Sequence, residues 1–178
     1  MGTIKTTNIE PIADNGTVTL GSSGDQFTLA TGAKSSFLYP AFLAYQGSTQ
    51  TIPNSTATKA EINTEEFDTD SCYDTSTYRF TPTVAGKYFV YAQLSLYGAS
   101  DIEVARTYIY KNGSSLVRGD VDPVNSYPQN RNTIKVSYTI DMNGSTDYVE
   151  AFGFLSTGST RSIENGRNSH FGAYRIGS

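Results

Sequence analysis

The sequence predicts an all-β protein, and two observations support this prediction. Short runs of alternating apolar and polar residues follow one another along the chain, separated by turns rich in Gly, Asn, Asp and Pro. No long stretch has the spacing of apolar residues that is typical of an amphipathic helix. The 178 residues suffice for one domain with a sizeable core and a short appendage.

The composition excludes several classes of function. The net charge of −4 and the isoelectric point near 4.9 argue against a nucleic-acid partner, which needs clustered Lys and Arg. Cys72 is the only cysteine, so no disulfide forms within the chain. The first residues, MGTIKTTNIEP, lack a positive region followed by an apolar core, and no apolar run is long enough to span a membrane. We therefore expect a soluble protein that is not exported by the usual route and has no membrane partner.

Residues 1–33 differ from the rest and carry a nine-residue repeat. Ile9, Val18 and Phe27 are nine positions apart, and Leu20 and Leu29 have the same spacing. One chain cannot bury an apolar face with such short segments. We predict an attachment segment or β-repeat stalk, in which three copies of the chain bury these five side chains together. The alternative is a flexible linker whose periodicity is accidental.

Residues 34–178 are predicted to form a head domain, which opens with a strand at PAFLAYQ (40–46). The longest alternating run follows Gly86. Because successive side chains of a strand point to opposite faces, this run has one wholly apolar face and one mixed face. The apolar face belongs in the core and consists of Tyr88, Val90, Ala92, Leu94 and Leu96. The mixed face indicates a half-covered sheet surface and consists of Phe89, Tyr91, Gln93, Ser95 and Tyr97.

The second half of the head continues the same pattern. Asn112-Gly113 is a strong signal for a two-residue hairpin between a strand at 104–111 and its return from Leu116, and residues 119–132 read as a surface loop. The strand at 134–140 points Ile134, Val136, Tyr138 and Ile140 inward. The segments 148–155 and 170–176 are apolar on both faces, which places them inside a sandwich or at a subunit contact.

The spacing of six residues between 62 and 88 resembles that of a known family. That family is the globular head of complement component one, subcomponent q. Its signature begins with an aromatic residue, then five positions, Asn or Asp, four positions and a second aromatic. It continues with six positions, Phe, five positions and Gly-x-Tyr-x-Phe-x-aromatic. That head is a relative of the tumour necrosis factor jelly roll. The matching positions are Ile62 (in place of the first aromatic), Asp68, Tyr73, Phe80, Gly86 and Tyr88. Val90 and Ala92 replace the last two aromatics, and we expect Phe89 and Tyr91 to take up that volume.

The resemblance implies a jelly-roll β-sandwich of about ten strands that assembles as a homotrimer. In the family the last strand lies close to the three-fold axis. On that basis the trimer contact is expected to include Phe42, Phe152, Phe154, Phe171 and Tyr174. The alternative for each of these residues is that it only fills the core of one subunit.

No set of residues predicts catalysis, a cofactor or a metal. His170 is the sole histidine, and neither a Ser nor a Cys nucleophile motif accompanies it. Asp68, Asp70 and Asp74 share one loop, and Asp120 and Asp122 share another. Carboxylate clusters hold calcium in some members of the family, but Asp is also favoured in turns on local grounds, and the sequence does not decide between the two.

A second resemblance concerns the start of the chain. The phrases NIEP at 8–11 and TVTLG at 17–21 are similar to the attachment ends of small tail-fibre and head-fibre proteins of bacteriophages. We therefore expect a non-enzymatic virion protein, a short trimeric fibre or capsid decoration, made in the host cytoplasm and exposed on the particle surface. Residues 1–33 would bind a capsid or tail protein, and the head would bind a host-surface glycan or protein. The alternatives are a secreted or cell-surface recognition module of the complement-head type, and an enzyme acting on glycans.

Overall fold

The computed structural model describes residues 40–99, 102–121, 130–158 and 160–177. All of the regular structure in these ranges is β. The strands are β1 Ala41–Gln46, β2 Gln50–Thr51, β3 Thr58–Lys59, β4 Thr64–Asp68, β5 Tyr73–Asp74, β6 Arg79–Phe80, β7 Gly86–Gly98, β8 Ile102–Lys111, β9 Ser114–Val121, β10 Arg131–Met142, β11 Val149–Thr157, β12 Arg161–Ile163 and β13 Gly166–Gly177. The predicted stalk residues Ile9, Val18, Leu20, Phe27 and Leu29 lie outside the described residues, and the boundary at residue 33 stays a prediction.

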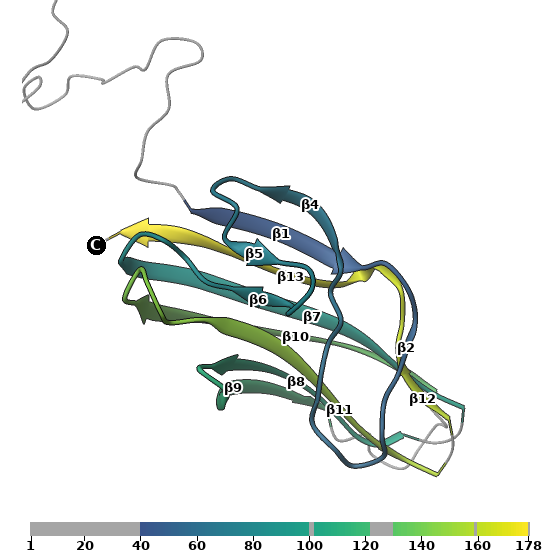
Figure 1. The fold of residues 1–178 in the computed structure, drawn as a ribbon. Helices are drawn as coiled ribbons and strands as arrows, with labels where there is room; N and C mark the ends of the chain where they lie inside the picture. Colours follow the sequence, from purple (N-terminus) through teal and green to yellow (C-terminus); the bar gives the residue numbers. More distant parts are fainter. Residues whose placement is uncertain (1–39, 100–101, 122–129, 159, 178) are drawn as a thin grey trace, which may run out of the picture. The chain divides into compact units, whose positions relative to one another are not determined.

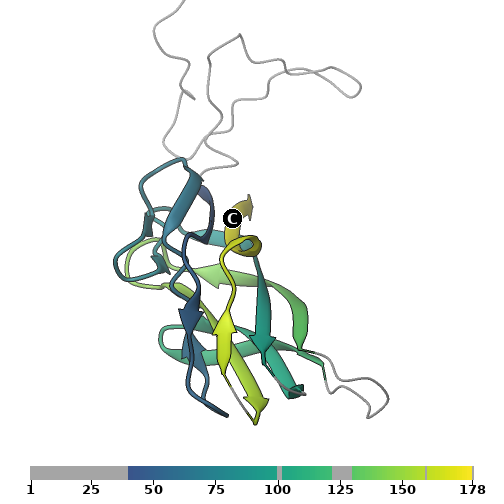
Figure 2. The same ribbon diagram turned by 90° about the vertical axis from the view of Figure 1, so that its right-hand side faces the viewer.

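The strands form two antiparallel sheets that pack face to face (Figure 1). Sheet A has the order β2-β12-β7-β13-β1-β4, and β10 pairs along the other edge of β7. Sheet B has the order β5-β6-β11-β8-β9, and β3 pairs with β11. The first long strand lies beside the last one, because β1 pairs with β13 from Ala41↔Tyr174 onward (Figure 2). The predicted all-β sandwich is confirmed.

The core between the sheets contains the apolar face of β7 that the alternation predicts. Tyr88, Val90, Leu94 and Leu96 have no exposed surface, and Ala92 is 2% exposed. They face β11 across the sandwich, where Val149, Ala151 and Leu155 are buried on one face of the strand. The inward assignment of these positions is therefore confirmed.

The residues of the signature pack together as one structural unit. The Phe42 ring stacks on Tyr73 and Phe80, with centroids 4.4 and 4.6 Å apart, and the Phe171 ring meets it edge-on at 5.2 Å. Ile62, with no exposed surface, lies in the same core. Phe42 adds an aromatic ring to this core, whereas Phe89 and Tyr91 lie on the opposite face of β7. The expectation that those two residues fill the core is wrong.

Polar contacts fix the loop that carries this unit. The Tyr73 hydroxyl donates to the carbonyl of Ile62 at 2.6 Å, and the Tyr73 amide donates to the Asp68 carboxylate at 2.8 Å. Burial raises the pKa of Tyr73 well above its ordinary value. Gly86 has φ of 146°, and a side chain there would overlap the carbonyl of Gly177. Asp68 thus accepts a hydrogen bond from the backbone of the loop, and Gly86 lets two backbone segments approach each other closely.

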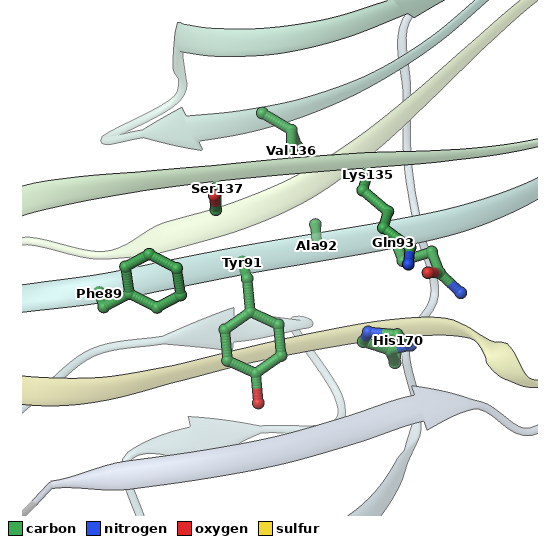
Figure 3. A pocket seen from close by; sticks show the side chains of 8 residues that line it. All are labelled: Phe89, Tyr91, Ala92, Gln93, Lys135, Val136, Ser137 and His170. Atoms are coloured by element: carbon green, nitrogen blue, oxygen red, sulfur yellow. The ribbon is translucent and has the colours of Figure 1, made fainter.

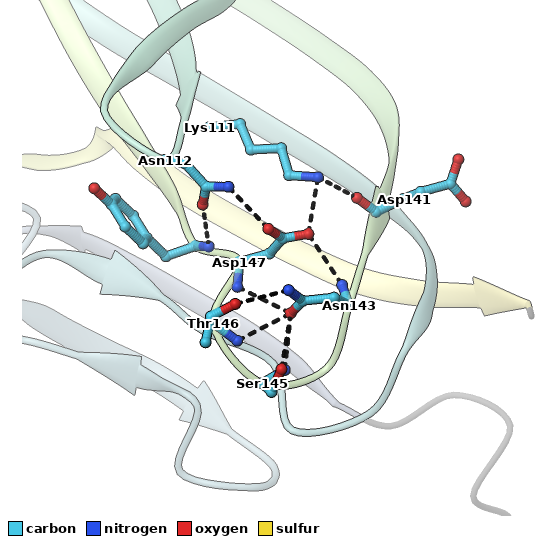
Figure 4. Close-up of polar contacts among 8 residues, drawn as sticks. Lys111, Asn112, Asp141, Asn143, Ser145, Thr146 and Asp147 are labelled. Atoms are coloured by element: carbon cyan, nitrogen blue, oxygen red, sulfur yellow. Dashed lines mark hydrogen bonds and ion pairs between the residues drawn. The ribbon is translucent and has the colours of Figure 1, made fainter.

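Two turns at one end of the sandwich are joined by a polar network (Figure 4). Asn112 and Gly113 have φ of 51° and 77°, as a two-residue hairpin turn with both positions left-handed requires. The Asp147 carboxylate accepts from the Asn112 side-chain amide at 2.8 Å and pairs with Lys111 at 2.9 Å. The Asn143 side-chain oxygen accepts from the backbone amides of 145–147. The contacts from Asn112 and Lys111 hold the pKa of Asp147 below its usual range.

Candidate functional site

The outer face of sheet A carries a cluster of aromatic side chains that no other part of the described chain covers. The rings of Phe89 and Tyr174 have centroids 5.4 Å apart, those of Phe89 and Tyr91 6.1 Å apart, and those of Tyr91 and His170 6.0 Å apart. The strand register explains the cluster, because Tyr174 pairs with Phe89 and Gly172 with Tyr91 across β13 and β7. We call the following set the aromatic face: Leu43, Tyr45, Phe89, Tyr91, His170 and Tyr174.

Tyr91 divides this face into two hollows. Its ring lies flat over β13 (Figure 3), and a side chain at Gly172 would overlap the ring. A hollow of about 270 Å³ lies on one side of Tyr91, between Phe89, Lys135 and His170. A hollow of about 160 Å³ lies on the other side, next to Leu43 and Tyr45. Burial raises the pKa of Tyr91, as expected for a phenol that lies against its own sheet.

Polar groups border the second hollow in fixed positions. Arg167 pairs with Glu66, and its guanidinium lies 4.8 Å from the centroid of the Tyr45 ring. The ion pair and the cation–π contact hold the guanidinium flat on the face. His170 Nδ1 lies 2.8 Å from the carbonyl oxygen of Arg167. Since a carbonyl only accepts, Nδ1 carries a hydrogen, and Nε2 is the acceptor in the neutral ring.

A second group of exposed apolar side chains lies along β9 and β10, at the border of the two sheets. Leu116, Val121 and Tyr138 are 42%, 38% and 47% exposed, and they define the apolar edge, formed by β9 and β10. The two strands approach each other closely, since a side chain at Gly119 would overlap the carbonyl of Lys135. Tyr138 follows the inward alternation of β10, but at this border no residue of sheet B covers it. The expectation that Tyr138 is a core residue is therefore wrong.

The five residues expected at a trimer contact fall into three groups. Phe42 and Phe171 have no exposed surface in the single chain, so their side chains cannot reach a second copy, and their assignment to a contact is corrected. Tyr174 is 42% exposed and belongs to the aromatic face. Phe152 and Phe154 are half-buried on the outer face of sheet B. There Phe152 stacks on Tyr110 at 3.9 Å between centroids.

Sequence reasoning did not single out Phe89 and Tyr91 as surface residues of a possible interface. The signal was present, because both occupy the mixed face of the alternating run in β7. Alternation assigns a side chain to one face of a strand, but it does not say what covers that face. The aromatic content of this face is what marks it as more than an ordinary solvated surface.

Three of the five carboxylates considered for calcium have other partners, and Asp70 contributes its backbone amide to Asp68. Asp68 accepts from the amide of Tyr73, and Asp74 accepts from the amides and hydroxyls of Ser76 and Thr77. Asp120 pairs with Arg106 and Arg118, and Asp122 lies outside the described residues. Among the residues that the structure describes, no group of three or more His, Cys, Asp or Glu is arranged to hold a metal ion. Within the same ranges no helix is long and apolar enough to cross a membrane.

The topology and the signature unit define the fold as a jelly roll of the complement-head and tumour necrosis factor type. Solved structures of that type resemble this chain over about three quarters of its length. The globular domain of zebrafish complement 1qA protein matches with a TM-score of 0.55 and 15% identity, over 77% of this chain and 97% of that one. The Eiger tumour necrosis factor structure from S. frugiperda matches with a TM-score of 0.57 and 11% identity, over 78% and 94%.

Murine APRIL at pH 8.0 matches with a TM-score of 0.57 and 9% identity, over 76% of this chain and 98% of that one. Each of these chains is covered almost completely, so the head corresponds to the whole of the domains it resembles. At this level of identity the likeness concerns the fold alone. No protein-family model matches the sequence, and no curated protein matches it in a sequence comparison.

Proposed function

We propose that this chain is a non-enzymatic, homotrimeric virion protein of a bacteriophage, a short fibre or capsid decoration whose jelly-roll head binds the host surface. The observation that carries the proposal is the presence of two different exposed apolar surfaces on one head, the aromatic face and the apolar edge. Exposed apolar side chains gathered on one surface are typical of a protein contact.

Two different surfaces favour a ring over a two-fold dimer. In a two-fold dimer each copy contributes the same patch to the contact, whereas in a ring one patch of each copy meets a different patch of the next. The apolar edge consists of exposed side chains at the border of the sandwich, and the aromatic face has hollows beside Tyr91. The hollow of about 270 Å³ beside Tyr91 has room for a side chain such as the Tyr138 ring of a second copy. The resemblance to the complement head supports three copies.

The phage assignment rests on the sequence of residues 1–33. Their repeat and their resemblance to fibre attachment ends support a role in binding a capsid or tail protein. Three heads on one such anchor present three identical sets of loops, and weak contacts to a host glycan or protein are then strengthened by multivalency. In this proposal the head is a binding domain on the surface of the particle.

A matched pair of variants tests the trimer. Val121 on the apolar edge and Val84 outside both surfaces are each 38% exposed. We expect native mass spectrometry to report a trimer for the wild type and for Val84→Asp, and a monomer for Val121→Asp. Only Val121→Asp buries a charge in the contact. A monomeric wild type, or equal behaviour of the two variants, would contradict the arrangement.

The virion assignment needs a separate experiment. We expect an antibody raised against the head to label purified phage particles in electron micrographs. We also expect the chain without residues 1–33 to form trimers that no longer join the particles. Particles without label, or unchanged incorporation of the shortened chain, would overturn the proposed anchor.

A further inference from the structure

A polar groove lies on sheet B, away from both the aromatic face and the apolar edge. Its volume is about 460 Å³, within the range of pockets that hold small organic ligands. One wall is formed by β3 and Glu61, and the other by the turn at residues 76–79. The structure brings these segments together because β3 and β6 both pair with β11.

The turn that forms the second wall is rigid. The Asp74 carboxylate accepts four hydrogen bonds, from the amide and hydroxyl of Ser76 and from those of Thr77. These bonds lower the pKa of Asp74 to about 2, and the bond from the Ser76 hydroxyl has the largest effect. The Tyr78 amide closes the turn by donating to the carbonyl of Asp74 at 2.6 Å.

The backbone of Tyr78 is strained within this turn. Its φ is 58°, a left-handed conformation in which a bulky side chain is disfavoured by about 1–3 kcal/mol. A Gly or Asn would fit the turn at lower cost. The residue kept there is a tyrosine, and it lines the groove. Strain of this kind persists only where surrounding contacts hold it, and it is found more often than average at binding sites.

Ion pairs fix the charged groups of the groove. Glu150 is 1% exposed and pairs with both Lys59 and Arg79 at 2.9 Å. Lys59 also donates to the carbonyl of Thr77 at 3.2 Å and so links the two walls. The Glu61 carboxylate is exposed on the first wall. Lys59 and Arg79 are thus offset by the carboxylates of Glu61, Glu150 and Asp74, which leaves the groove without net positive charge.

We propose that this groove binds a saccharide. A sugar ring needs a carboxylate to accept from its hydroxyls, donors to its oxygens and an aromatic ring for its C–H face. The groove offers Glu61, the pair of Lys59 and Arg79, and Tyr78 in these three roles. The absence of net positive charge disfavours phosphate and nucleic acid as ligands. The inference deepens the proposed host-surface binding and rests on it, but it does not depend on the trimer.

The test is a titration of the full-length, isotope-labelled chain, followed by NMR. The probes are the methyl glycosides of glucose, galactose and N-acetylglucosamine, each added to millimolar concentrations. We expect at least one of them to shift the amide signals of residues 58–61 and 76–79. Glu61→Gln should weaken binding of that sugar about tenfold, since a hydrogen bond to a charged group is lost. Glu65→Gln, an exposed carboxylate on β4, should leave the affinity unchanged.

A second variant separates binding from folding. Tyr78→Gly removes the ring and relieves the strained backbone, so we expect cooperative unfolding to persist while binding of the sugar is lost. The proposal is overturned if none of the three glycosides shifts these amides, if the shifts fall elsewhere, or if Tyr78→Gly binds as the wild type does. A trimeric chain that binds no glycoside would refute the groove alone, whereas a monomeric chain that binds one would refute the trimer alone.

Discussion

Replacing Phe42 with Ala distinguishes a core residue from a contact residue. The Phe42 side chain has no exposed surface and contacts three aromatic rings, those of Tyr73, Phe80 and Phe171. An aromatic side chain buries about 150–250 Å², which at about 25 cal/mol per Å² corresponds to about 4–6 kcal/mol. Ala retains part of this, so we expect the free energy of unfolding to fall by about 3–5 kcal/mol.

The loss is large compared with the total stability of a domain, which is about 5–15 kcal/mol. For a chain of this size it corresponds to a decrease in Tm of about 6–20 °C. Urea unfolding, followed by the fluorescence of the 13 tyrosines and by circular dichroism, measures the change. The measurement is repeated at several protein concentrations, because association makes the midpoint concentration-dependent.

Leu43→Ala is the matched control on the neighbouring residue. Leu43 points to the opposite side of β1 and belongs to the aromatic face, so we expect this variant to weaken the trimer more than the isolated subunit. If Phe42→Ala costs less than about 1 kcal/mol and instead abolishes association, the assignment of Phe42 to the core is refuted.

Three further outcomes are expected. Gly172→Val should displace the Tyr91 ring and reduce association, measured by native mass spectrometry, while the chain still unfolds cooperatively; an unchanged trimer would contradict the flat packing of the ring. Tyr73→Phe leaves the buried carbonyl of Ile62 without its donor and should destabilise the head by about 1–3 kcal/mol in urea unfolding. Asp147→Asn should reduce the dependence of stability on pH in acid. The pKa of this carboxyl is lower in the folded than in the unfolded chain, so its contribution is present above the unfolded pKa and is lost as the pH falls through the folded one. If the free energy of unfolding of the wild type and of the variant depends equally on pH below about pH 4, this contribution of Asp147 is ruled out.

The sequence predicts which residues face the core, but it does not predict what covers the outer faces of the sheets. Strand alternation places Tyr88 and its neighbours in the core, and the spacing of Tyr73 and Phe80 identifies the jelly roll. Both are local signals, since a pleated strand has a fixed period and a turn accepts few residue types. Alternation fails at Tyr138, because it cannot say how far the opposite sheet extends.

The polar groove could not be predicted for a different reason. Its walls are separated in the sequence and meet only because β3 and β6 pair with the same strand. The conformation of Tyr78 also contradicts its propensity, since tyrosine favours strands and rarely adopts positive φ. Sites that depend on distant pairing and on a locally disfavoured backbone are where reasoning from the sequence is weakest.

The pairing of β1 with β13 has a practical consequence for engineering. The Arg175 amide donates to the carbonyl of Pro40, and Ala41 lies opposite Tyr174, so the chain enters and leaves the sandwich at the same end. The opposite end, where Gly98 lies opposite Arg161, carries neither terminus. A fluorescent reporter or affinity tag joined to the C-terminus would start at the end of the sandwich where Pro40 lies and would leave the opposite tip unobstructed.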